Sequence, residues 1–98
     1  MSMRPSELEG KKVIATEAKI VGTVSGIEID CSAWKVTHLQ IELTDELVEI
    51  LGYKKPFLGH VEILLSVDAV KAVGDVVALN KAIKELKDII EPPKRAPT

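Results

Sequence analysis

The fold is decided by residues 20–30, which read IVGTVSGIEID. The apolar side chains of this stretch do not keep one alternation, because Val24 lies at an even position whereas Ile27 and Ile29 lie at odd positions. Successive side chains of a β-strand point to opposite faces, so a change of phase requires one extra residue. Glycine tolerates such a β-bulge, and Gly26 stands at the change. We therefore predict a long strand that bulges near Gly26.

The next apolar stretch, Trp34–Leu43, changes phase in the same way. Its apolar residues move from even to odd positions between Val36 and Leu39. Two long neighbouring strands that each change phase predict a strongly coiled hairpin, and Gly22 offers a second place to bend. Glycine-bent strands allow a small sheet to curl into a barrel. The alternative is a sheet buried on both faces, which also blurs alternation.

The rest of the chain predicts shorter elements around this hairpin. Four apolar runs predict further strands: Lys11–Thr16, His60–Val67, Ala69–Val73 and Val76–Leu79, the last two joined by a turn at Gly74. The sequence thus predicts a mainly β fold of about six strands. The boundaries are a lead-in over residues 1–10, the barrel over 11–79, a C-terminal helix over 80–91 and a flexible tail over 92–98.

Two stretches have helical spacing. Over Thr44–Leu51 the apolar residues recur at three and four positions, Thr44 can act as N-cap, and Gly52 can end the helix. This predicts a short helix inserted between strands. A second helix carries an apolar stripe through residues 80–91, with Asn80 as its expected cap.

Length and composition limit what the domain can be. A chain of 98 residues forms one domain. Domains of this size often need a disulfide, a metal or a second subunit for stability. Cys31 is the only cysteine and shares no ligand spacing with the two histidines, so a second subunit, in a homodimer, is the expected support. The formal net charge of −2 provides no field that attracts nucleic acid. No apolar run is long enough to span a membrane, and a lone cysteine without a signal peptide predicts a cytoplasmic location.

No set of residues in the sequence assembles a catalytic site. Cys31 lies in a predicted turn without a basic neighbour, and His38 and His60 are predicted on strands. The glycines at positions 22 and 26 lie within a strand and lack the lysine of a phosphate-binding loop. We therefore expect no enzyme activity, no metal and no cofactor. The structural glycines are Gly22, Gly26, Gly52 and Gly74.

A protein-binding surface is better supported by the sequence. The loop after the inserted helix combines aromatic and basic side chains, which are common in binding surfaces. The expected partner-binding residues are Trp34, Tyr53, Lys54, Lys55, Pro56 and Phe57, with the stripe of the C-terminal helix as a further candidate surface. The alternative is that Tyr53 and Phe57 fold back over the core and that the lysines only solvate the loop.

The order of these motifs resembles the PRC-barrel domain, a fold shared by the H subunit of the photosynthetic reaction centre and the ribosome-maturation factor RimM. The matching segments are Gly10–Val13, Val21–Val24 and the closing element Val70–Leu79. The turn Glu17–Lys19 departs from the pattern because it lacks the Asp-Gly often found there.

As a short chain with the sequence KKPFLG at residues 54–59, the protein resembles archaeal PRC-barrel proteins of cell division. The resemblance implies a non-catalytic, homodimeric adaptor of the cell-division machinery, associated with FtsZ and its membrane anchor SepF at the division site. By analogy with RimM, the alternative is a module associated with ribosome or RNA processing.

Overall fold

The structure, a computed structural model, describes residues 3–54 and 59–92. The elements in chain order are α1 (Pro5–Leu8), β1 (Lys12–Ile14), β2 (Ile20–Asp30), β3 (Lys35–Leu43), α2 (Asp45–Ile50), β4 (Glu62–Ser66), the 3₁₀ turn η1 (Val67–Ala69), β5 (Val70–Val73), β6 (Val76–Leu79), α3 (Ile83–Ile89) and β7 (Ile90–Glu91). The predicted fold class, mainly β with an inserted helix and a C-terminal helix, is confirmed.

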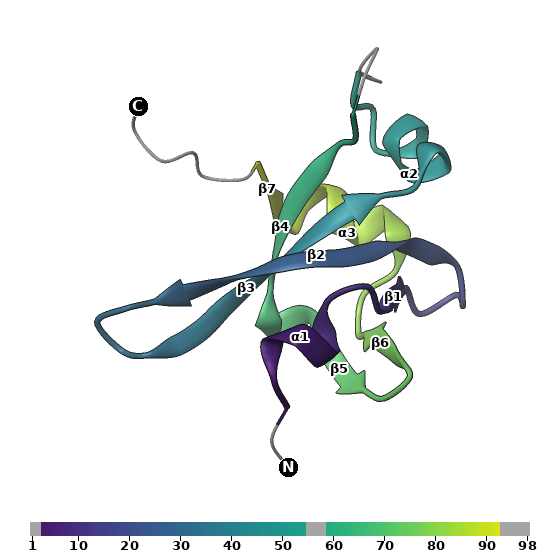
Figure 1. Ribbon diagram of the computed structural model, residues 1–98. Helices are drawn as coiled ribbons and strands as arrows, with labels where there is room; N and C mark the ends of the chain where they lie inside the picture. Colours follow the sequence, from purple (N-terminus) through teal and green to yellow (C-terminus); the bar gives the residue numbers. More distant parts are fainter. Residues whose placement is uncertain (1–2, 55–58, 93–98) are drawn as a thin grey trace.

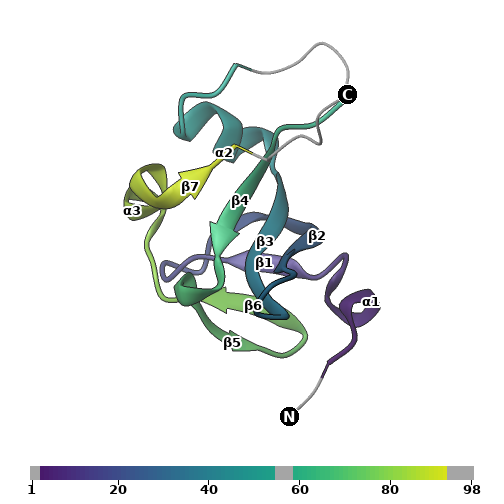
Figure 2. The same ribbon diagram turned by 90° about the vertical axis from the view of Figure 1, so that its left-hand side faces the viewer.

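The described strands form one curved sheet in the order β5-β6-β1-β2-β3-β4-β7. β1 pairs in parallel with β6, and the other neighbours are antiparallel. Figures 1 and 2 show β5 and β6 at one end of the domain and α2 and α3 at the opposite end. The sheet therefore curls around a core that the helices close, which is the predicted barrel-like shape.

Both phase changes in the sequence are bulges in the β2–β3 ladder. Val24 pairs with Ile41 and Gly26 with Gln40, so Ser25 is the extra residue of β2. Glu28 pairs with His38 and Ile29 with Val36, so Thr37 is the extra residue of β3. Without the extra residue, the apolar side chains on the two sides of it would point to opposite faces of the sheet. With it, they all point to the core face.

Gly22 lies where the backbone of β3 packs tightly against that of β2. A Cβ atom built on Gly22 would overlap the backbone carbonyl oxygen of Glu42 and lie 3.0 Å from a methyl group of Ile41. Gly26 is less restricted, because a Cβ there would meet only the side chain of Gln40, at 3.4 Å. The two glycines of the deciding stretch therefore differ in function: Gly22 permits close packing of the backbone, and Gly26 adjoins the bulge.

The core is built from aliphatic side chains. α2 contributes Leu47 and Val48, and α3 contributes Ile83 and Leu86. Among the described residues, no polar or charged side chain is buried. Ala15, Leu51 and Ala69 lie outside the strands and belong to the same core. The strands supply the remaining core residues: Val13, Val21, Val24, Leu39, Ile41, Leu43, Ile63, Leu65, Val77 and Leu79.

The C-terminal region differs from the prediction. Asn80 does not cap a helix; its side chain donates to the carbonyl oxygen of Asp68, and α3 begins three residues later. Two carboxylates satisfy the free N–H groups at the start of α3 instead: Glu85 accepts from the backbone of Ala82, and Glu17 accepts from Ile83. The Glu17 carboxylate comes from the turn between β1 and β2, so a local pattern could not reveal it.

The last predicted helical turn is wrong as well. Residues 90–91 form β7, which pairs Ile90 with Leu65 and Glu91 with Leu64 of β4. This adds a seventh strand to the predicted six and attaches the end of α3 to the sheet. The apolar stripe of the helix misled the prediction, because Ile90 is also partly buried when it lies in a strand.

The difference between the two glycines gives a stability prediction. Gly22→Ala should lower the free energy of unfolding by roughly 2–3 kcal/mol, because the new Cβ forces β2 and β3 apart. Gly26→Ala is the matched control and should cost less than about 1 kcal/mol, since its Cβ makes ordinary contacts. Urea unfolding of both variants measures the difference. Equal losses would contradict the close approach at Gly22.

The start of α2 gives a second stability prediction. The Thr44 hydroxyl accepts from the backbone N–H of Leu47 at 3.2 Å. Thr44→Ala removes this acceptor and should cost about 1 kcal/mol, whereas Thr44→Ser keeps it and should stay close to the parent. Thermal unfolding followed by circular dichroism compares them, and an unchanged alanine variant would show that the cap contributes nothing.

Candidate functional site

The far ends of β2 and β3 form a two-stranded arm, which we define as residues 26–37. On the side of β2, pairing with β1 ends at Thr23, and the backbone bonds from residues 10 and 11 reach only Val24. On the side of β3, β4 pairs no further than His38. Within residues 3–54 and 59–92, neither outer edge of the arm has a strand partner. Figure 1 shows the arm projecting beyond the rest of the domain.

One face of the arm is apolar and continues the core face of the sheet. Leu39 is buried, and Ile27, its partner across the ladder, packs against the core. The next pair on that face, Ile29 and Val36, is 43% and 41% exposed. The bulges at Ser25 and Thr37 therefore carry the apolar face past the buried core, to a part that the described residues cover only in part.

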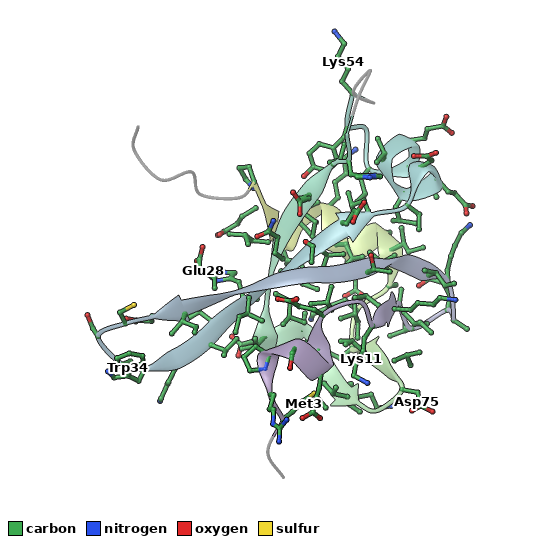
Figure 3. All side chains as sticks on the ribbon, in the orientation of Figure 1. Met3, Lys11, Glu28, Trp34, Lys54 and Asp75 are labelled. Carbon is green, nitrogen blue, oxygen red and sulfur yellow. The ribbon has the colours of Figure 1, made fainter. Side chains whose placement is uncertain are left out.

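Trp34 lies at the tip of the arm with 80% of its surface exposed (Figure 3). The carboxylate of Asp30 accepts from the backbone N–H groups of Ser32 at 2.9 Å and Ala33 at 3.3 Å, which holds the turn before it. Trp34 itself has a φ of 53°, in the left-handed region that favours glycine. It therefore belongs to the turn and does not begin the strand as predicted. A bulky residue rarely adopts this conformation, which makes Trp34 a candidate for a functional role.

The opposite face of the arm is polar. His38 lies at the base of this face, with Nδ1 3.4 Å from the carboxylate of Glu28 and Nε2 3.6 Å from that of Glu91. The Thr37 hydroxyl lies 2.9 Å from the same Nδ1. The two nitrogens of the ring face carboxylates on different strands, so His38 links β3 to β2 and β7. Because Nδ1 and Nε2 lie on opposite sides of the ring, these groups do not converge on one metal position.

The other predicted surface, the loop after α2, is only partly described. Tyr53 is half-buried and packs against the core, as the alternative had it, whereas Lys54 is exposed and points away from the domain (Figure 3). Lys55, Pro56 and Phe57 lie outside the described residues. Gly52, with a φ of 81°, follows the end of α2, and Gly74 lies between β5 and β6.

The apolar stripe of α3 is not a free surface. Ile83 and Leu86 are core residues, and Ile89 and Ile90 pack against the core. Sequence reasoning named this stripe and missed Ile29 and Val36. The phase changes in the sequence were the signal for these two residues, because they place both on the apolar face. Alternation alone does not say how much of that face other elements bury.

The residues considered for chemistry remain apart. Cys31 is exposed in the turn of the arm, and the His60 ring is 68% exposed and lies 2.8 Å from the carboxylate of Glu42. His38 is engaged with carboxylates at the base of the arm. Over residues 3–54 and 59–92, no three His, Cys, Asp or Glu side chains gather as a metal site. In the same residues, no helix has the length and apolar character to cross a membrane.

The fold is found in a solved structure of distant sequence. The crystal structure of a 16S ribosomal RNA processing protein, RimM from Pseudomonas aeruginosa, matches with a TM-score of 0.55 at 16% sequence identity. The match covers 85% of this chain and 46% of that protein, so this chain spans about half of its length. At this identity the likeness concerns the fold alone.

Comparison of the sequence itself gives the family. No curated protein sequence matches the chain. The family model for the PRC-barrel domain matches residues 1–86, which include every strand described above except β7 and nearly all of the core. The chain therefore belongs to the PRC-barrel domain family.

Proposed function

We propose that this domain is a non-catalytic protein-interaction adaptor that acts as a homodimer. The observation that supports it most is the exposed tryptophan at the tip of the arm. Tryptophan is enriched among the few residues that supply most of the binding energy in protein interfaces. Trp34 is presented on a hydrogen-bonded turn, so little conformational entropy is lost when it is buried.

The proposed process is cell division, in which the adaptor would associate with FtsZ and its membrane anchor SepF at the division site. This part of the proposal rests on the resemblance of the short chain to archaeal PRC-barrel proteins. An adaptor of this kind requires exposed anchors rather than a reactive site, and Trp34 at the tip of the arm is such an anchor.

A second candidate function is suggested by the fold it shares with RimM, which is named for 16S ribosomal RNA processing. RNA binding depends on basic side chains that contact phosphates. Several described basic residues are instead engaged with acceptors of the protein: Lys11 with the carbonyl oxygen of Gly74 at 2.6 Å, Lys19 with Glu46 at 2.5 Å, and Arg4 with Glu7 at 3.9 Å. The arm itself carries both signs of charge. These pairings favour the protein-interaction proposal.

Binding to purified partners tests the proposal directly. The immobilised chain should retain purified FtsZ or SepF from the same source organism above the level of a blank support. Single-stranded RNA, added in parallel at increasing salt, should show no steep loss of affinity, since few phosphate contacts are expected. Retention of RNA with strong salt dependence and of neither division protein would replace the adaptor proposal with the RNA-processing one.

Substitution of Trp34 separates binding from folding. Trp34→Gly removes the anchor and also relieves the left-handed backbone, so the free energy of unfolding should stay within about 1 kcal/mol of the parent. Affinity for the retained partner should fall at least about tenfold, or roughly 1.4 kcal/mol. Lys54→Ala is the matched control on the other candidate surface and should bind normally. If Lys54→Ala loses binding and Trp34→Gly does not, the anchor lies in the loop after α2.

A further inference from the structure

We infer that, in the homodimer, the apolar faces of two arms stack against each other, with Ile29, Val36 and Trp34 of each copy forming the contact. The inference rests on the proposed homodimer and names its interface. Trp34 then serves the adaptor by holding its two copies together, and Trp34→Gly lowers partner affinity because it dissociates the dimer that binds the partner. It follows from three properties of the arm: it has only two strands, its charges lie on one face, and the apolar area that it exposes is limited.

The apolar face of the arm is expected to pack against another surface, because the arm has only two strands. Ribbons of this kind are at best marginally stable in water unless further strands or a packed face support them. Beyond Leu39 the described residues cover the apolar face only in part, since Ile29 and Val36, directed to it by the two bulges, are 43% and 41% exposed. A sequence that keeps large aliphatic side chains on a partly exposed face is expected to cover that face in its working state.

The positions of the charges on the arm favour contact between the apolar faces of two arms over backbone pairing of two strand edges. Glu28 and His38 pair across the ladder, as do Asp30 and Lys35, and the register places all four on the face opposite to Ile29 and Val36. Two apolar faces can therefore meet without burying a charged side chain.

Pairing of two β2 edges about a two-fold axis at residues 28–30, the part of the edge that β1 and residues 10–11 leave free and that carries the acids, would bring these acids together. Centred on Ile29, it would set Glu28 opposite Asp30 of the partner subunit. Centred on Glu28, it would set that residue opposite its own copy. Like charges directly opposite each other destabilise a ladder. Stacking of the same patch from each copy instead gives a closed two-fold dimer that does not extend to a filament.

The exposed area limits the strength of the contact. A tryptophan buries on the order of 150–250 Å² when it is covered, and Ile29 and Val36 are only partly exposed. Specific interfaces bury about 800 Å² on each partner. The arm therefore supplies a central anchor but less than a full standard interface, and we expect a reversible dimer that dissociates on dilution.

The only tryptophan of the chain makes this interface observable. In the monomer, the emission of Trp34 should be at long wavelength and strongly quenched by iodide. As concentration rises, the emission should shift to shorter wavelength and quenching should fall, with the same midpoint as dimer formation in sedimentation velocity. A dimer that forms while emission and quenching stay constant would overturn the inference and leave the homodimer intact. A chain that stays monomeric at all concentrations would overturn both.

Two matched variants test the same face without the fluorophore. Val36→Lys places a charge in the contact and should weaken the dimer at least tenfold, whereas Ile50→Lys, at a residue of similar exposure on α2, should leave it unchanged. Both variants should keep the circular dichroism spectrum and melting temperature of the parent. If Val36→Lys unfolds, Val36→Thr retains the β-branched shape and reports on the same contact. Dimers of parental strength in a folded Val36 variant, or loss of the dimer in Ile50→Lys, would move the interface away from the arm.

Discussion

The two bulges of the β2–β3 ladder are the constraint on which the rest of this structure depends. Without Ser25, the side chains after Val24 would turn over, and Ile27 would leave the core face. Without Thr37, Val36 would lie on the polar side. The two extra residues lie on different strands and at different positions along the ladder. As a result, both strands keep one apolar face over their whole length. They also strengthen the local twist, which lets a sheet of short outer strands curl around an aliphatic core.

The same hairpin belongs both to the barrel-like sheet and to the surface that we propose for interaction. At one end, Gly22 allows the backbone of β2 to approach that of β3 closely, and α2 and α3 close the core. At the other end, the hairpin continues past its neighbours as the arm. The core face and the face proposed for interaction are therefore one surface, buried at Leu39 and partly exposed at Ile29.

Local chemistry was predictable wherever it is contained in a few neighbouring residues. Thr44 as the cap of α2, the bulge next to Gly26 and the turn before Trp34 all follow from short patterns. The errors lie where a distant residue competes with a local pattern. Asn80 has the chemistry of a cap, yet it bonds to Asp68, and Glu17 takes the position at α3 from across the domain. Ile90 has helical spacing, but pairing with Leu65 satisfies its backbone in a strand.

The sequence by itself determined which face of each strand each side chain occupies, because that depends only on alternation and on where it slips. Its composition also predicted the aliphatic core. Only the tertiary structure decided how far along β2 and β3 the neighbouring elements extend and bury the apolar face. β1 is three residues long and β4 pairs with β3 no further than His38, and both limits arise from the path of the whole chain. Exposure of Ile29 and Val36 is therefore a property of their neighbours in space, which alternation along one strand does not encode.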